Sequence, residues 1–351
     1  MSVSYIYPGS FSPPTYGHAE IVRLAREVLP HLKIVCSRHP QKQSWFSEKE
    51  CTRLWSSYGL PDQVSVTTFE EATKTLGDVR QVVMIRGLRD ETDLEEEKRV
   101  LVQNWKTLGL NKFFYLITDS AFCHVSSSAA RQAAICLDWF ALKELLSPLA
   151  VTATLERALG FEHLFLVVGK PGSGKSTFLQ ELVRMDPRNV HVNTDDFNHH
   201  LRPMLESHFG TVDLASLALQ KEEELKAVII KPWMNMLADA LRMIPKGSRV
   251  FVEIPFGMQE DKQMYRFVGG KVVFVGCGEE ENVRRLTARH TPHLLPFMHR
   301  IPGWKETQEI AQRNRLLLHR IQTDGEEKKT SEAARHFHQH LNTILTEEHH
   351  G

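Results

Sequence analysis

A glycine-rich segment in the middle of the chain has the residue types and spacing of a phosphate-binding loop. Residues 169–177 read GKPGSGKST and match the pattern GxxxxGK[ST], between an apolar run and a helical run. In such a loop consecutive backbone N–H groups surround a phosphate, the Lys175 ammonium reaches its outer oxygens, and the Ser176 hydroxyl binds Mg²⁺ beside ATP. We therefore expect ATP to be bound by Gly169, Gly172, Gly174, Lys175, Ser176 and Thr177.

Charged residues that could assist phosphoryl transfer from ATP follow this loop. Residues 193–196 read NTDD and end an expected strand, where Asp195 could accept the proton of an acceptor hydroxyl while Lys175 acts on the phosphate. Asp196 either shares that work or caps the next helix. A helix expected over 279–290 carries Arg284, Arg285 and Arg289. These arginines either belong to a lid and neutralise the transferred phosphoryl group, or they form a solvated helix face.

A second set of candidate residues lies near the start of the chain. Residues 7–11, YPGSF, leave the first expected strand, and residues 15–18, TYGH, open a helix. Gly9 and Gly17 let the backbone approach a ligand, and free N–H groups at a helix start attract negative charge. His18 can donate a hydrogen bond to a phosphate oxygen. Three hydroxyls before another helix provide a second anion site, at Ser126, Ser127 and Ser128.

The segment RGLR at residues 86–89 adds two guanidinium groups, Arg86 and Arg89, at another strand end. Each can hold a phosphate through two parallel hydrogen bonds. A TxGH segment, a serine triplet or an RGLR turn is by itself common as a cap or a surface turn. Their combination at successive strand ends, where ligands bind in open α/β sheets, predicts a triphosphate site.

Both sets of residues require parallel sheets to position them. Short apolar runs alternate with helical stretches, so we expect an α/β protein with two doubly wound parallel sheets, a Rossmann-like domain followed by a P-loop kinase domain. The boundary is expected near Gly160, giving domains 1–160 and 161–351, and the polar stretch 323–331 is expected as a loop. The expected strands are 3–7, 32–36, 64–66, 82–85 and 113–117 in the first domain, and 163–168, 190–193, 249–254 and 271–275 in the second.

The composition limits the classes of partner. The chain has 351 residues with 43 Lys plus Arg and 43 Asp plus Glu, so no bulk positive field exists to bind nucleic acid or an acidic membrane. No apolar run reaches the roughly 18 residues of a membrane span, and the five cysteines show no CxxC spacing, so we expect a cytoplasmic protein. His336 and His340 lack a third ligand, and no metal is expected beyond Mg²⁺ with ATP.

Residues 1 to about 158 resemble phosphopantetheine adenylyltransferases, which are nucleotidyltransferases with an HxGH-type signature. The likeness rests on residues 8–11, 15–18, 40–42, 86–97 and 126–128. RGLR discriminates best, because nicotinamide mononucleotide adenylyltransferases share the other signals but not usually this one. The resemblance implies that the 4'-phosphate of phosphopantetheine attacks the α-phosphorus of ATP and releases pyrophosphate, with Mg²⁺ bridging the phosphates. Dephospho-coenzyme A is the product, and no covalent protein intermediate is needed.

The resemblance also implies roles for individual residues. Ser10 and Lys42 would hold the acceptor phosphate, His18 the ATP phosphates, and Arg89 and Glu97 the nucleotide. Catalysis would rest on alignment and charge neutralisation by His18, Lys42 and Arg89. The nucleotide site would also include Gly9, Phe11, Gly17, Ser126, Ser127 and Ser128, and the substrate site Arg86 and Asn104. Two departures leave the acceptor open: Ser12 replaces an aspartate, and residues 67–74 lack a leucine-methionine pair.

The second half resembles dephospho-coenzyme A kinase more loosely. The likeness rests on the phosphate loop, residues 193–195, 208–210 and 252–255, and the helix before Arg289, with Asn193 in place of the first acid of a DxD. Zeta-toxin-like and polynucleotide kinases have similar loops, so the acceptor of the kinase stays open. Together the halves resemble a bifunctional coenzyme A synthase that makes and then phosphorylates dephospho-coenzyme A.

Two other functions are compatible with the same residues. One is an adenylyltransferase for nicotinamide mononucleotide fused to a small-molecule kinase, and the other is a nucleotide-sensing regulator without turnover. All three predict small-molecule partners. Oligomerisation through the nucleotidyltransferase domain is left open by the sequence, as is passage of an intermediate between the sites.

Overall fold

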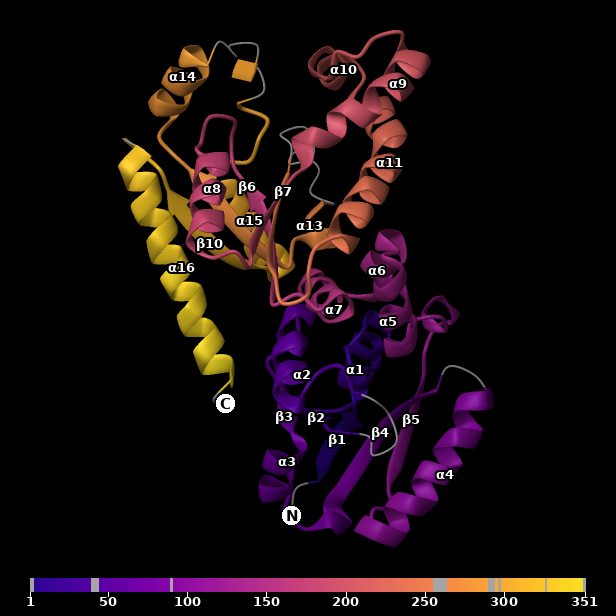
Figure 1. Cartoon of the computed structure of the whole chain (residues 1–351). Helices are drawn as coiled ribbons and strands as arrows, with labels where there is room; N and C mark the ends of the chain where they lie inside the picture. Colours follow the sequence, from indigo (N-terminus) through magenta and orange to yellow (C-terminus); the bar gives the residue numbers. More distant parts are fainter. Residues whose placement is uncertain are drawn as a thin grey trace. The chain divides into compact units, whose positions relative to one another are not determined.

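The computed structural model describes residues 3–38, 44–88, 91–254, 264–289, 294–295, 298–325 and 327–349. The chain divides into two compact units, Met1–Thr154 and Leu155–Gly351, each with its own five-stranded sheet (Figure 1). The division falls inside helix α7 (Pro148–Leu159), whose last residue precedes the expected boundary at Gly160. The fold prediction is confirmed, because every strand pair in both sheets is parallel and each sheet is doubly wound.

The first unit has the strand order β3-β2-β1-β4-β5. The chain therefore fills the sheet on one side of β1 and then on the other, and the switch point lies between β1 and β4, where α/β sheets bind ligands. Its elements are β1 (Ser4–Gly9), α1 (Tyr16–Val28), β2 (Leu32–Cys36), α2 (Glu48–Trp55), η1 (Ser56–Tyr58), β3 (Val64–Thr68), α3 (Phe69–Thr75), η2 (Val79–Gln81), β4 (Val82–Leu88), α4 (Glu91–Leu108), β5 (Phe113–Ile117), η3 (Ser120–Phe122), α5 (Ser127–Cys136) and α6 (Trp139–Leu145).

The helices that flank this switch point begin at defined caps. Thr15 precedes α1 and accepts a hydrogen bond from the backbone N–H of His18, which gives the helix a fixed start beside the end of β1. The buried residues Ile21, Val22 and Ala25 lie on the α1 face that packs on β2, β4 and β5. A separate apolar cluster that includes Ile6, Ala72 and Met84 joins β1, β4 and α3.

The second unit has the strand order β10-β9-β6-β8-β7, with β6 at its centre. All six residues of β6 are buried, as expected for a continuous apolar run in the middle of a parallel sheet. Its elements are β6 (His163–Val168), α8 (Lys175–Met185), β7 (Asn189–Asn193), η4 (Thr194–Phe197), α9 (Asn198–Phe209), α10 (Leu214–Gln220), α11 (Glu222–Arg242), β8 (Arg249–Glu253), α13 (Met264–Val268), β9 (Lys271–Gly276), α14 (Glu279–Ala288), α15 (Trp304–Asn314), β10 (Leu317–Gln322) and α16 (Glu327–His349).

Two elements near the C-terminal end of the chain differ from the sequence expectation. Strand β10 was not expected, because it is an edge strand whose residues are mostly half-buried or exposed and whose apolar pattern is weak. The prediction of a loop over 323–331 was wrong from Glu327 onward, where α16 starts. Figure 1 shows α16 lying alongside α8, and packing against that helix stabilises its polar first turns.

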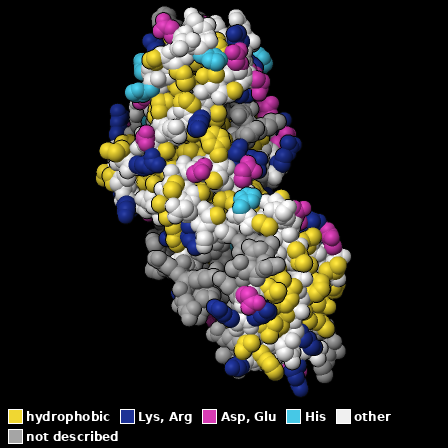
Figure 2. Space-filling view, turned by 90° about the vertical axis from the view of Figure 1, so that its right-hand side faces the viewer, with side chains coloured by type: hydrophobic (Ala, Val, Ile, Leu, Met, Phe, Trp, Pro, Cys, Tyr) yellow, Lys and Arg dark blue, Asp and Glu magenta, His cyan; other side chains and the backbone are white. Residues whose placement is uncertain are grey.

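The surface shows no single-sign charge field on the side that Figure 2 presents. Basic and acidic side chains are interspersed there, in agreement with their equal numbers in the sequence. None of the described helices is long and apolar enough to cross a bilayer. All five cysteines are free thiols.

The core beneath α8 and α16 gives a stability prediction. Phe337 on α16 is buried, and its ring contacts those of Phe165, Phe178 and Phe251. Phe337→Ala should therefore lower the free energy of unfolding of the second unit by about 3–5 kcal/mol. Differential scanning calorimetry measures this loss. His336→Ala, a change at the exposed neighbouring position, should leave the unfolding temperature unchanged. The same unfolding temperature in both variants would contradict the packing described.

Candidate active sites

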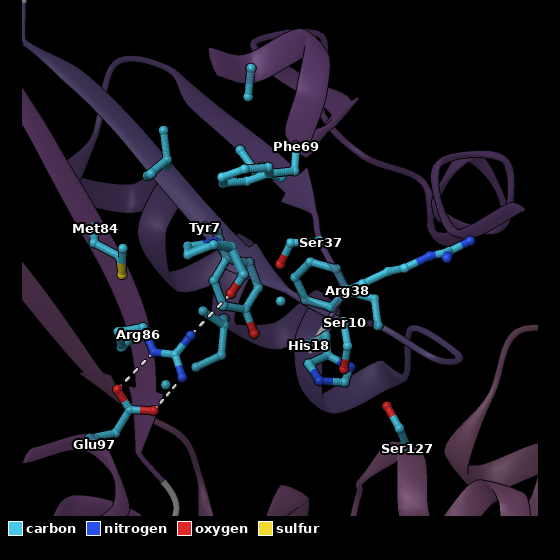
Figure 3. A pocket seen from close by; sticks show the side chains of 18 of the residues that line it. Tyr7, Ser10, His18, Ser37, Arg38, Phe69, Met84, Arg86, Glu97 and Ser127 are labelled. Atoms are coloured by element: carbon cyan, nitrogen blue, oxygen red, sulfur yellow. Dashed lines mark hydrogen bonds and ion pairs between the residues drawn. The ribbon is translucent and has the colours of Figure 1, made fainter. Parts of the chain in front are cut away.

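The carboxyl ends of the first unit's strands open into a cavity of about 730 Å³. In Figure 3, Ser10, His18 and Ser127 lie near one another, while Arg86 reaches Glu97 on another side of the cavity. Most of the residues predicted for this site line the one cavity: Gly9, Ser10, Phe11, Gly17, His18, Arg86, Glu97, Ser126, Ser127 and Ser128.

The ring of His18 is oriented by the helix cap. Its Nδ1 accepts a hydrogen bond from the backbone N–H of Thr15 at 3.1 Å and lies 2.9 Å from the hydroxyl of the same residue. Because Nδ1 is the acceptor, a neutral ring carries its proton on Nε2, the nitrogen that can donate to an anion. The buried ring of Phe11 packs edge-on against His18, with 5.1 Å between centroids.

The two predicted anion sites of this unit lie side by side. A Cβ at Gly17 would lie 3.0 Å from the carbonyl oxygen of Val125, so a residue without a side chain lets the start of α1 approach the segment before α5. The hydroxyl of Ser127 donates to the carbonyl of Pro13 at 2.7 Å, and Ser126 caps α5 by accepting from Ala129 N–H. Both helix starts therefore border the same cavity.

Arg86 and Glu97, predicted as separate ligand contacts, also contact each other. Arg86 Nε donates to Glu97 Oε2 at 2.8 Å, Arg86 Nη2 pairs with Glu97 Oε1, and Arg86 Nη1 donates to the carbonyl of Pro8 at 3.1 Å. Burial works to lower the pKa of Arg86, but the hydrogen bonds and charge of Glu97 outweigh it and raise the pKa. The pair thus joins β4 to α4 and holds a charged group at the cavity wall.

Arg131 is a cavity residue that the sequence reasoning missed. Its Nη1 donates to the carbonyl of Ser12 at 2.6 Å, its Nη2 donates to Ser128 Oγ at 3.0 Å, and burial lowers its pKa. Its signal was present, since an arginine three residues after Ser128 lies on the same face of the helix. This guanidinium adds a positive charge beside the start of α5, where a phosphate would lie.

The departure at Ser12 has a structural explanation. The buried Ser12 hydroxyl accepts hydrogen bonds from the backbone N–H groups of Trp45 at 2.8 Å and Phe46 at 3.2 Å, and from Ser44 Oγ at 3.1 Å. It thereby fixes the chain directly after residues 39–43. A serine oxygen satisfies these donors without a carboxylate.

Three predicted residues cannot be placed in this cavity. Lys42 and Arg89 lie outside the described residues, as does the whole segment 40–42. Asn104 belongs to α4, but its side chain is outside the described part of the chain. In the stretch without a leucine-methionine pair, Phe69 and Thr73 of α3 line the cavity instead.

The phosphate loop of the second unit joins β6 to α8. Gly169 is required there, because a Cβ would lie 2.0 Å from the carbonyl oxygen of Val275. Lys175 Nζ donates to the carbonyls of Gly169 at 2.9 Å and Lys170 at 3.3 Å, so the lysine folds back over its own loop. Burial lowers the pKa of Lys175, and the opposing attraction of Glu253 is smaller. Gly172, Gly174, Ser176 and Thr177 lie in this loop and the first turn of α8, as predicted from the motif.

Glu253, at the end of β8, is the central acid of this site. It lies 3.9 Å from Lys175 Nζ and accepts hydrogen bonds from Ser176 Oγ at 3.3 Å and from His191 Nε2 at 2.9 Å. Glu253 was not predicted as a site residue, although it lies in the segment 252–255 and an acid after an apolar strand beside a phosphate loop is a signal that could have found it. The hydroxyl of Ser176 and this carboxylate are oxygen donors, which fit Mg²⁺ bound together with a nucleotide.

Asp195 lies close to this cluster. Its pKa is raised by burial and then by the charge of Glu253, which together exceed the opposing effect of Lys175. Asp196 does not cap α9, which begins without a side-chain cap; it accepts instead from Asn193 Nδ2 at 3.2 Å. Asn193 itself caps the short helix η4 by accepting from Asp195 N–H at 3.2 Å.

The two arginines of α14 and its C-cap residue, Arg289, have three different environments. Arg284 is exposed and pairs with Glu281. Arg285 donates to the carbonyl of Thr323 at 2.6 Å and to that of Gly172 at 3.4 Å, so it braces the phosphate loop. The charge of Arg289 contributes to lowering the pKa of Lys175, although burial is the main cause.

Comparison with known proteins first gives the class of the first unit. A family model described as cytidylyltransferase-like matches residues 6–133, a range that contains the His18 turn and the serine-capped helix. This unit is accordingly a Rossmann-like nucleotidyltransferase domain. A solved structure titled Plasmodium falciparum nicotinic acid mononucleotide adenylyltransferase complexed with NaAD has a TM-score of 0.32 and 14% identity to this chain, and covers 44% of this chain and 96% of its own.

Curated relatives then give the family. The phosphopantetheine adenylyltransferase of Carboxydothermus hydrogenoformans is 30% identical over 132 residues, which are 37% of this chain and 82% of the relative. That of Chloroflexus aurantiacus is 34% identical over 133 residues, which are 37% and 81%. The chain belongs to the phosphopantetheine adenylyltransferase family. The predicted resemblance of its first half is confirmed, and the resemblance of its second half to a kinase stays a prediction because the family model ends at residue 133.

The role of Ser12 can be tested by removing its hydroxyl. Ser12→Ala leaves the half-buried N–H of Trp45 and the buried N–H of Phe46 without their acceptor, which should cost about 1–3 kcal/mol of the first unit's free energy of unfolding. Hydrogen exchange followed by mass spectrometry should show faster exchange at Trp45 and Phe46. Ser44→Ala removes the contacts of the Ser44 hydroxyl with Ser12 and with the carbonyl of Phe46 but keeps the Ser12 acceptor, so exchange at the two amides should stay slower than in Ser12→Ala. Unaltered protection of both amides in Ser12→Ala would contradict this role.

Proposed function

We propose that the chain is a bifunctional enzyme of coenzyme A biosynthesis. Its first unit transfers the adenylyl group of ATP to 4'-phosphopantetheine, giving dephospho-coenzyme A and pyrophosphate. Its second unit transfers the γ-phosphoryl group of a second ATP to the ribose 3'-hydroxyl of that product. Both reactions use ATP with Mg²⁺.

Support for the first step comes from family membership together with the cavity that the helix starts of α1 and α5 border. Adenylyl transfer requires the attacking phosphate oxygen, the α-phosphorus and the leaving pyrophosphate to lie in line. A bond forms between the 4'-phosphate oxygen and the α-phosphorus, while the bond from that phosphorus to the bridging oxygen breaks. His18 Nε2–H and Arg131 lie where charge on the phosphate oxygens can be neutralised.

Lys42 and Arg89 complete this proposal as further cations of the first site, and Ser10 and Asn104 as acceptor contacts. These four roles come from the family resemblance, and of these residues Ser10 lines the described cavity. The nucleotide contacts of Gly9, Phe11, Gly17, Glu97 and the serine triplet are proposed on the same ground.

The second step is supported most by the arrangement around the phosphate loop. Lys175 and Ser176 follow Gly174 at the start of α8. Glu253 ends β8, and Asp195 lies in η4 directly after the neighbouring strand β7. Asp195 takes the proton of the acceptor hydroxyl, whose oxygen then bonds to the γ-phosphorus as ADP leaves. Magnesium bound with the nucleotide would neutralise phosphate charge, held by Ser176 with Glu253. The raised pKa of Asp195 makes this carboxylate a stronger base than an exposed aspartate.

The two activities should be separable by single substitutions. His18→Ala removes a donor to the reacting phosphates and should slow dephospho-coenzyme A formation by about 10²–10³-fold. Lys175→Ala should leave that step intact and let dephospho-coenzyme A accumulate without conversion to coenzyme A. The measurement incubates each full-length variant with Mg-ATP and 4'-phosphopantetheine and follows the products by mass.

The control for this experiment is His336→Ala, which removes an exposed histidine and should retain both activities. Loss of dephospho-coenzyme A formation in Lys175→Ala, or loss of phosphorylation of added dephospho-coenzyme A in His18→Ala, would contradict two independent centres. Formation of NAD from nicotinamide mononucleotide, without product from phosphopantetheine, would favour the alternative acceptor. Binding of ATP without release of pyrophosphate or ADP would favour a sensor.

The environment of Asp195 predicts the pH dependence of the kinase step. A base must be unprotonated, so the rate should fall as pH decreases through the pKa of Asp195, which lies above the ordinary value of 3.8. The measurement is the rate of ADP release with dephospho-coenzyme A as acceptor across the acid range. Asp195→Asn should reduce this rate by about 10²–10⁴-fold. The charge of Asp196 also raises the pKa of Asp195, so Asp196→Asn should move the acid-side fall in rate to lower pH. An unchanged pH profile in Asp196→Asn would contradict the assignment of Asp195 as the base.

A further inference from the structure

The two oxygens of the Glu253 carboxylate face different neighbours. Oε2 accepts the hydrogen bond from His191 Nε2 at 2.9 Å, and Oε1 is the oxygen that lies 3.9 Å from Lys175 Nζ. Ser176 Oγ is nearly equidistant from them, at 3.3 Å from Oε1 and 3.4 Å from Oε2. The imidazole therefore holds one edge of the carboxylate while the other edge points to the phosphate loop.

Strand pairing brings His191 to this place. His191 on β7 pairs in register with Phe251 on β8, two residues before Glu253, so the three side chains lie on the same face of the sheet. The side chain of Glu253 is 8% exposed and that of His191 is 16% exposed. The contact is thus shielded from water on the face that α8 covers.

The backbone of Glu253 is fixed independently of the imidazole. The buried hydroxyl of Thr194 donates to the carbonyl oxygen of Glu253 at 2.5 Å, and β8 pairs with both β6 and β7. Loss of the His191 ring would therefore free the carboxylate to rotate without moving the strand. Burial works to raise the pKa of Glu253, but the hydrogen bond from His191 and the charge of Lys175 outweigh it, so the carboxylate stays ionised.

We propose that His191 is a positioning residue of the second site, which orients the Glu253 carboxylate so that Ser176 and Glu253 together receive the Mg²⁺ that arrives with ATP. This inference rests on the proposed kinase function of the second unit. An imidazole N–H that fixes a carboxylate beside a metal position typically changes metal affinity about 10–100-fold when removed. A purely structural histidine would affect the fold or the nucleotide affinity with and without metal alike.

The experiment measures binding of a fluorescent ATP analogue to the full-length chain as Mg²⁺ is added. Lys175→Ala removes binding at the phosphate loop, so the binding that this variant keeps is assigned to the first unit and subtracted. In His191→Phe, the Mg²⁺ concentration at which the gain in affinity for the analogue is half-maximal should rise about tenfold. The affinity for the analogue without Mg²⁺ should stay unchanged. His191→Gln, whose side-chain amide can donate to the same oxygen, should recover part of the shift.

A double-mutant cycle separates positioning from other effects. If His191 acts through the carboxylate, His191→Phe should add no further change in Mg²⁺ dependence to a chain that already carries Glu253→Gln. Thermal unfolding checks that each variant is folded. If His191→Phe does not fold, the same cycle is measured with His191→Gln and Glu253→Gln.

Four results would count against the inference, in three different ways. Unchanged Mg²⁺ dependence in His191→Phe, or additive effects in the double variant, would overturn the positioning role. Equal weakening with and without Mg²⁺ would overturn it in favour of a structural histidine. A wild-type chain with no Lys175-dependent binding would refute the kinase function itself, and the inference with it.

Discussion

Both candidate sites depend on the point where the central strand of a parallel sheet ends and the chain turns into a helix, because the first N–H groups of a helix have no partner within the helix itself. β1 and β6 each lie between two other strands, so the chain must leave the sheet at its carboxyl edge and turn into a helix. The first turns of α1, α5 and α8 present amides that only a ligand, water or a cap can satisfy. A phosphate chain meets this need with oxygens and negative charge, which makes phosphate chemistry the natural use of these edges.

Many side chains around these turns form hydrogen bonds to the backbone and hold it in place. In the first unit, Ser127 and Arg131 donate to carbonyls of Pro13 and Ser12, and Ser12 holds the chain after residue 43. In the second unit, Arg285 braces the phosphate loop through Thr323 and Gly172. The turns are therefore preorganised, and less conformational entropy is lost when a nucleotide binds.

Much of this could be predicted from the sequence, since alternating strands and helices and the glycine turns are local signals. The fold class and the cluster of Ser10, His18 and the serine triplet follow from them. β10 was missed because an edge strand with one solvated side has little apolar periodicity. The Arg86 pair with Glu97 and the contact of Arg285 with Thr323 depend on tertiary packing between elements, which no local pattern encodes.

One chain is proposed to bind two nucleoside triphosphates, one in the cavity of the first unit and one at the phosphate loop of the second. Isothermal titration calorimetry of the full-length protein with Mg²⁺ and a non-hydrolysable ATP analogue measures this directly. We expect a stoichiometry of two analogues per chain. A stoichiometry of one would contradict it, since one of the two glycine turns would then not bind a nucleotide.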